Sequence, residues 1–232
     1  MIRRLQASRN WVFDLDNTLY PAECDLFAQI DQRMTKFVSE YLQMHPEKAR
    51  KLQKKYYLEH GTTLNGLMEN HRIEPEEFLE FVHDIDHSVL PHSPDLRRAI
   101  EALPGRKMVF TNGSNGHATS VLAALGLQDI FDGIVDIEAT GFIPKPSQPA
   151  YDHLVKHFDL VPDQSVLFED LSRNLLPAHD MGFVTVLVYS NKDWSHEPEA
   201  ARPASSSATE QHVHFSTDNL TEFLVNLSGE PS

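Results

Sequence analysis

The sequence predicts an α/β fold, in which a Rossmann-like open parallel sheet carries an inserted, all-helical cap. Short and nearly continuous apolar runs alternate with segments of helical periodicity, which is typical of parallel strands covered by helices on both faces. One connection, between the first run and the second, is about ninety residues long and has a helical pattern almost throughout. The chain of 232 residues is long enough for one core and such an insert.

The position of the insert divides the chain into two predicted units. Residues 1–20 and 91–232 form the α/β core, which contains the candidate catalytic site, and residues 21–90 form the helical cap. A crossover between parallel strands needs only a dozen or so residues. A helical segment as long as this one therefore indicates a separate body over the edge of the sheet.

Six apolar runs predict the strands of the core. Most of them are short and apolar at nearly every position, as strands buried on both faces require. The predicted strands are Trp11–Asp16, Lys107–Asn112, Gly133–Ile137, Ser165–Asp170, Phe183–Val188 and His212–Ser216.

The segments between these strands predict the core helices. Ser93 offers a helix N-cap, with Pro94 at the first helical position. Gly126 and Gly182 are typical C-terminal stops. The predicted helices are Leu96–Leu103, Asn115–Leu125, Pro149–Phe158 and Leu171–Met181.

The cap sequence predicts several helices joined by short breaks. One apolar stripe has a spacing of three or four residues; it comprises Leu26, Ile30, Met34, Phe37 and Tyr41. Pro46 opens a second helix, which is interrupted at Gly61, and a third segment covers Leu64–Asn70. Acidic residues around Pro75 indicate a further N-terminus, because the helix dipole favours negative charge there.

Composition limits the partners and the compartment. The net charge is −14 and we find no Lys/Arg stripe, so we expect no nucleic acid polymer as a partner. We find no signal peptide and no apolar run of membrane-spanning length, so we expect no membrane. Cys24 is the only cysteine, which fits a cytoplasmic protein. Glu197–Gln211 is predicted to be a mobile loop, and the protein to be a monomer or homodimer.

Polar residues follow the predicted strands at the ends where ligands bind in open α/β sheets. Asp14 and Asp16 end the first strand, and Lys145 lies in a loop after the third. The second strand is followed by Thr111, Asn112 and Gly113, and the fourth by Glu169 and Asp170. Because the carboxyl ends of parallel strands share one edge, we expect these side chains to gather there.

These groups suit hydrolysis of a phosphate ester. Asp14 is the candidate nucleophile, which forms an aspartyl-phosphate, and Asp16 is the candidate general acid and base, for which its pKa must be raised. The phosphoryl oxygens are expected to bind Lys145 and the segment Thr111, Asn112 and Gly113. Mg²⁺ prefers oxygen ligands; the expected set is Asp14, the backbone carbonyl of Asp16, Asp170, and Glu169 through water.

The four motifs together resemble the haloacid dehalogenase superfamily. The aspartate-x-aspartate-x-threonine motif is met by Asp14–Thr18, and the Thr or Ser after the second strand by Thr111. The motif lysine is met by Lys145, and the acidic pair by Glu169 and Asp170. This resemblance implies an α/β core, Mg²⁺ dependence and the residue roles given above. The insert after the first strand matches the helical cap of one large branch.

The segments Tyr56–Leu67 and Asp16–Pro21 are similar to those of the pyrimidine 5′-nucleotidase subgroup. This resemblance implies release of phosphate from pyrimidine nucleoside monophosphates such as UMP and CMP. The catalytic core contacts only the phosphate, so the cap must select the remainder of the substrate. Candidate specificity residues in the cap are Tyr57, Gly61, Thr62 and Gly66.

Other functions remain open. The substrate could be another small phosphorylated metabolite, such as a sugar phosphate, and a phosphomutase is a minor option. A 2-haloacid dehalogenase uses the same first aspartate, but needs neither Mg²⁺ nor an acid at Asp16, because a halide leaves without a proton. A non-catalytic binding protein would not require the complete set. His83 and His87 have the spacing of a zinc pair, but no third ligand is evident, so we interpret them as surface histidines or as satisfied structural ones.

Overall fold

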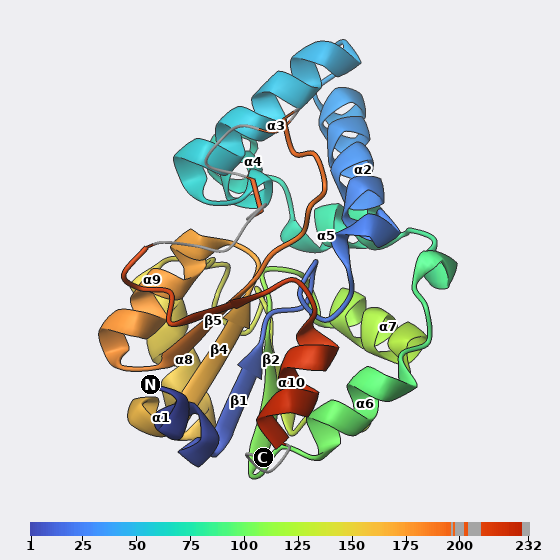
Figure 1. Ribbon diagram of the computed structural model, residues 1–232. Coiled ribbons are helices and arrows are strands. Elements are labelled where there is room, and N and C mark those ends of the chain that lie inside the picture. Colours follow the sequence, from blue (N-terminus) through green and yellow to red (C-terminus); the bar gives the residue numbers. More distant parts are fainter. Residues whose placement is uncertain (196, 198–201, 204–209, 229–232) are drawn as a thin grey trace.

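The computed structural model describes residues 1–195, 197, 202–203 and 210–228 (Figure 1). Six parallel strands form one sheet, in the order β3-β2-β1-β4-β5-β6. The order confirms the predicted α/β class and puts β1 between β2 and β4. The strands are β1 (Asn10–Phe13), β2 (Arg106–Phe110), β3 (Gly133–Val135), β4 (Ser165–Glu169), β5 (Val184–Val188) and β6 (Phe215–Thr217).

Helices cover both faces of this sheet, and β1 illustrates why. Trp11 and Phe13 pack into the core on one face, while Val12 packs into the core on the other. The first face carries α1 (Ile2–Ala7), α6 (Pro94–Glu101), α7 (Asn115–Leu125) and α10 (Leu220–Ser228). The second carries α8 (Gln148–Phe158) and α9 (Ser172–Met181). A strand buried on both sides needs an apolar residue at every position, which is the pattern in the sequence.

The insert between β1 and β2 forms the predicted helical cap. Its helices are α2 (Leu26–Tyr41), α3 (Pro46–His60), α4 (Thr63–His71) and α5 (Pro75–His83), flanked by the short 3₁₀ turns η1 (Ala22–Cys24) and η2 (His87–Val89); a third turn, η3 (Pro162–Gln164), precedes β4. The cap has its own apolar core, which includes Ile30, Phe37, Leu67 and Phe78. Figure 1 shows the cap above the carboxyl ends of the strands. The exact boundaries of the two units stay a prediction.

The structure corrects several predicted boundaries. β1 ends at Phe13 rather than Asp16. The last sheet hydrogen bond of this segment is donated by the N–H of Asp14 to the carbonyl of Phe168, and the chain then leaves the sheet. β6 starts at Phe215 rather than His212. The helices α1 and α10 were not predicted. Most of the predicted loop Glu197–Gln211 lies outside the described residues.

The described part of the chain contains no helix that is both long and apolar enough to cross a membrane.

Two helical glycines provide a matched test of cap packing. A Cβ added at Gly66 in α4 would lie 2.3 Å from Cγ of Tyr56, whereas one added at Gly116 in α7 meets nothing within 4 Å. Gly66→Ala should therefore lower the free energy of unfolding by about 1–3 kcal/mol through overpacking. Gly116→Ala should raise it by up to about 1 kcal/mol, because alanine is the better helix former. Urea unfolding measures both, and equal effects of the two substitutions would contradict this account of Gly66.

Candidate active site

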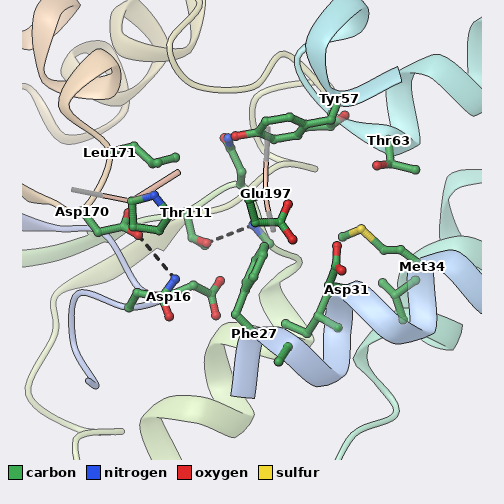
Figure 2. Close-up of a pocket in the computed structure, with 18 of the residues that line it drawn as sticks. Asp16, Phe27, Asp31, Met34, Tyr57, Thr63, Thr111, Asp170, Leu171 and Glu197 are labelled. Atoms are coloured by element: carbon green, nitrogen blue, oxygen red, sulfur yellow. Dashed lines mark hydrogen bonds between the residues drawn. The ribbon is translucent and has the colours of Figure 1, made fainter. Parts of the chain in front are cut away.

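The carboxyl edge of the sheet brings the predicted catalytic groups into one cavity of about 400 Å³ (Figure 2). The loop after β1 supplies Asp14 and Asp16, and the end of β4 supplies Glu169 and Asp170. Thr111 and Lys145 come from the segments that follow β2 and β3. Residues distant in sequence are thus neighbours because their strands are parallel and adjacent.

Lys145 is the buried centre of the site, with only 1% of its side chain exposed. Its ammonium group donates to three acceptors: Asp14 Oδ1 at 2.6 Å, Glu169 Oε1 at 2.9 Å and the backbone carbonyl of Phe110 at 2.8 Å. Burial alone disfavours a charged lysine, but the charges of Asp14 and Glu169 raise its pKa. Lys145 therefore stays protonated and holds Asp14 by one oxygen.

Glu169 has its hydrogen-bonding capacity taken up by the protein. Oε1 accepts from Lys145 and from Asn174 Nδ2 at 2.6 Å, and Oε2 accepts from the backbone N–H of Leu171 at 2.7 Å. Although burial opposes ionisation, Lys145 and these donors keep the pKa of Glu169 below its ordinary value. Glu169 thus serves as an anchor for Lys145, a role that the sequence did not indicate.

Asp14, Glu169 and Asp170 form a buried acidic group whose ligand oxygens all lie within 4.8 Å of one another. Burial raises the pKa of Asp14 to about 7, although the positive charge of Lys145 lowers it. Burial and the charges of Glu169 and Asp14 also raise the pKa of Asp170. One ammonium faces three carboxylates, so the group has surplus negative charge. Oxygen donors with such a surplus fit a hard divalent cation such as Mg²⁺.

The side chain of Asp16 differs from the expected acid, while the expected metal ligand at this residue, its backbone carbonyl, stays a prediction. Its side chain is not part of this acidic group; Oδ1 instead accepts from Tyr20 Oη at 2.5 Å and bonds His117 Nε2 at 2.8 Å. Burial would raise its pKa, but the charge and hydrogen bond of His117 and the bond from Tyr20 keep the pKa below the ordinary value. The role of general acid requires a raised pKa at Asp16, whereas these contacts lower it.

His117 is a site residue that the sequence reasoning missed. It lies in the first turn of α7, three residues after the N-cap Ser114, and its side chain is fully buried. The signal was present: a helix that follows the second strand points its N-terminal turn at the carboxyl edge. A histidine in that turn is therefore a candidate for contact with Asp16.

Residues 111–113 form a tight turn beside Lys145. Thr111 Oγ1 accepts from the N–H of Gly113 at 2.9 Å. The Asn112 side chain is paired at both ends with the backbone of Lys145, at 2.8 and 3.2 Å. Asn112 thus fixes the lysine loop to the end of β2. Any contact of Asn112 with phosphate therefore depends on its backbone.

The four candidate specificity residues of the cap separate into two pairs. Tyr57 and Thr62 line the cavity. Gly61 and Gly66 are not among the lining residues. Gly61 ends α3 with φ of +82° and packs against Pro144, while Gly66 makes room for the ring of Tyr56. The two glycines serve chain geometry and packing.

The cap wall of the cavity is largely apolar, with one charged cluster. Its apolar lining includes Phe27, Ile30, Met34, Leu64, Phe78, Leu79 and Val82. Asp31 of α2 pairs with Arg50 and Lys54 of α3, each at 2.6 Å. Glu197, which is labelled in Figure 2, pairs with Arg50 at 3.0 Å. No motif in the sequence indicates these cap residues.

Comparison with known proteins places this geometry in context. The chain is 28% identical over 212 residues to Phosphate metabolism protein 8 of Saccharomyces cerevisiae, covering 83% of this chain and 65% of that protein's length. The structure is similar to a haloacid dehalogenase-superfamily (HAD) phosphatase from Thermococcus onnurineus, with a TM-score of 0.63, 20% identity, and coverage of 96% of this chain and 99% of the other. It also resembles the L-2-haloacid dehalogenase of Xanthobacter autotrophicus, with a TM-score of 0.56, 14% identity, and coverage of 97% and 100%.

Structural neighbours at this level of identity establish the fold alone, and they include both phosphatases and dehalogenases. The family model for haloacid dehalogenase-like hydrolases matches residues 10–182, which span β1 to the end of α9 and contain every core catalytic candidate. The chain therefore belongs to the haloacid dehalogenase-like hydrolase family.

Proposed function

We propose that this hydrolase is a Mg²⁺-dependent phosphomonoesterase that acts on nucleoside monophosphates, and on pyrimidine nucleotides such as UMP and CMP in particular. One observation carries the proposal: Lys145 fixes one oxygen of Asp14, while Asp170 adds buried negative charge beside it. This arrangement suits a carboxylate nucleophile and a cation that together bind a phosphate in the cavity.

In the first step, an oxygen of Asp14 attacks phosphorus and the bond from phosphorus to the leaving alcohol breaks. Lys145 keeps the carboxylate oriented and compensates charge on the phosphoryl group. Asp14 and Asp170 would hold Mg²⁺, whose positive charge would offset the repulsion between carboxylate and phosphate. The product is an aspartyl-phosphate on Asp14.

Asp16 donates a proton in the first step and accepts one in the second. The negative charge of an arriving phosphate raises the pKa of a neighbouring carboxyl, which allows Asp16 to carry the proton that the leaving alcohol takes up. Asp16 is then ionised, as it is in the unliganded site. In the second step it accepts a proton from the water that attacks phosphorus, and the bond from phosphorus to Asp14 breaks.

The carboxylates favour phosphate transfer over dehalogenation. A halide leaves without a proton, so a dehalogenase has no use for Asp16, and no use for a cation beside Asp170. The lining of the cavity supports a nucleoside as the remainder of the substrate. Phe27 and Tyr57 offer aromatic surface for a base, and Asp31 offers polar contacts to its edge. The cytoplasmic location and the monomeric or homodimeric state stay predictions.

A substrate panel tests this function. Phosphate release is measured with UMP, CMP, AMP and sugar phosphates, with Mg²⁺ or with EDTA, and halide release with 2-chloropropionate. We expect Mg²⁺-dependent turnover, with the highest kcat/KM for UMP or CMP. A sugar phosphate as the best substrate would overturn the nucleotide assignment alone. Halide release without phosphate release would overturn the assignment as a phosphatase.

The contact between Tyr57 and the base predicts a change in KM. Tyr57→Ala should raise KM for UMP by about 5- to 100-fold, because stacking on a base contributes about 1–3 kcal/mol. Turnover of glycerol phosphate, which has no base, should change little. Leu58→Ala is the matched control, since Leu58 is the next residue of α3 and is 49% exposed. Equal losses on both substrates would contradict base stacking by Tyr57.

The charge surplus predicts that Mg²⁺ stabilises the fold through Asp170. At 100 times its Kd, Mg²⁺ should add about 2.7 kcal/mol to the free energy of unfolding of the wild type. Asp170→Asn should lose most of this gain, and Asp152→Asn, at an exposed position on α8, should keep it. Thermal unfolding with EDTA or Mg²⁺ measures the shift. An unchanged shift in Asp170→Asn would exclude this residue as a ligand.

Without metal, the stability of Asp170→Asn relative to the wild type should depend on pH. Since the folded pKa of Asp170 is raised above its unfolded value, the native state binds the proton more tightly, and stability is lost as the pH rises above about 4. In EDTA, Asp170→Asn should therefore become increasingly more stable than the wild type from pH 4 towards pH 7. A stability difference that stays constant over this range would contradict the raised pKa of Asp170.

A further inference from the structure

Three histidines gather beside Asp16. His117 belongs to α7 of the core, His83 is the last residue of α5 in the cap, and His87 lies in η2. The rings of His83 and His117 are stacked, with centroids 4.5 Å apart and planes inclined by 11°. The ring of His87 lies farther away, at 6.1 Å from His117. The cluster thus links cap and core next to the proposed acid–base residue.

His117 fixes the orientation of Asp16. Its Nε2 bonds Oδ1 of Asp16 at 2.8 Å, on the same oxygen that accepts from Tyr20. With Oδ1 held twice, Oδ2 is turned towards the turn at Gly113, where an added Cβ would lie 3.8 Å from it. That turn carries the proposed phosphate-binding groups, so Oδ2 of Asp16 lies next to the residues that would hold the phosphate.

His83 in turn fixes His117. Its Nδ1 lies 2.9 Å from Oγ of Ser114, and the same hydroxyl accepts from the backbone N–H of His117 at 3.3 Å. Burial and the neighbouring His117 lower the pKa of His83 to about 3, so its ring is neutral and packs flat against His117. A residue of the cap therefore supports both the side chain and the helix turn of His117.

Packing alone does not account for an imidazole at position 117. Among the described residues, Nδ1 of His117 is buried without a hydrogen-bond partner. A buried nitrogen without a partner costs about 1–3 kcal/mol, which an apolar ring of similar shape avoids. The bond from Nε2 to Asp16 is what the imidazole adds to the site.

We propose that His117 is a positioning residue that holds Asp16 with Oδ2 towards the leaving-group oxygen, and that His83 completes this arrangement when the cap sits over the core. The inference rests on the proposed function, because it assumes that Asp16 transfers protons. It assigns a task in the same reaction to two residues for which the sequence motifs gave no role. His117 acts through Asp16 and makes no contact with the substrate.

The proposal is tested by substitutions at His117 that differ in whether the new side chain can donate a hydrogen bond to Asp16. His117→Phe keeps a ring but lacks the donor, and His117→Asn has an amide too short to reach Asp16. Both should lower kcat for the best substrate about 10- to 100-fold with KM within threefold, because misplacement of a catalytic group typically costs about this much. His117→Gln, whose amide reaches the position of Nε2, should recover most of the loss. The Asn variant keeps the test valid if the Phe variant does not fold.

A double substitution separates this inference from the proposed function. If His117 acts only through Asp16, adding His117→Phe or His117→Asn to Asp16→Asn should cause no further loss of the residual activity. An equal further loss would mean independent action and would overturn the inference. Wild-type kcat in both His117→Phe and His117→Asn, with Asp16→Asn inactive, would also overturn the inference. The proposed phosphatase function would not be affected by that result. A fully active Asp16→Asn enzyme would instead refute the proton-transfer role of Asp16.

Two cap variants complete the experiment. His83→Ala removes the stacked ring and the bond to Ser114, so it should reduce kcat in the same direction as His117→Phe, by a smaller factor. His87→Phe is the matched control from the same cluster, and its kcat should stay within twofold of the wild type. A normal kcat in His83→Ala would overturn the part of the proposal that links the cap to Asp16.

Discussion

The site depends on one buried ammonium group that joins three parts of the chain. Lys145 binds Asp14 after β1, the carbonyl of Phe110 at the end of β2, and Glu169 at the end of β4. Removal of one partner from a buried ion pair typically costs about 3–5 kcal/mol, because the other charge is left uncompensated. These contacts therefore fix the relative positions of three strand ends, and with them the direction in which Asp14 points.

The remaining charge gives the site its chemistry. Burial, together with the charges of the neighbouring carboxylates, raises the pKa of both Asp14 and Asp170. In the proposed function, a divalent cation would relieve this repulsion, and the cation together with Lys145 would favour a phosphate dianion in a chain whose net charge is −14. Local charge at the base of the cavity, rather than the charge of the whole protein, thus accounts for an anionic substrate.

The core and its motif residues could be predicted because they depend on local pattern and on one topological rule. Apolar runs predict buried parallel strands, and parallel strands bring Asp14, Lys145 and Asp170 to one edge. The contacts that tune these groups come from side chains whose partners are far away in sequence. The pairing of Asn112 with the Lys145 backbone and the bond from His117 to Asp16 are examples. The lowered pKa of Asp16 follows from such contacts, so the sequence could not reveal it.

The central claim is that Asp14 is phosphorylated during turnover, and trapping of the intermediate tests it most directly. The enzyme is mixed with radioactively labelled UMP, or with the best substrate of the panel, quenched in acid during turnover and mapped by peptide. The account predicts an acid-stable, hydroxylamine-labile label on the peptide that contains Asp14, and no label in Asp14→Asn, which folds but does not turn over. Phosphate release without a covalent label, or a label on a peptide without Asp14, would contradict it.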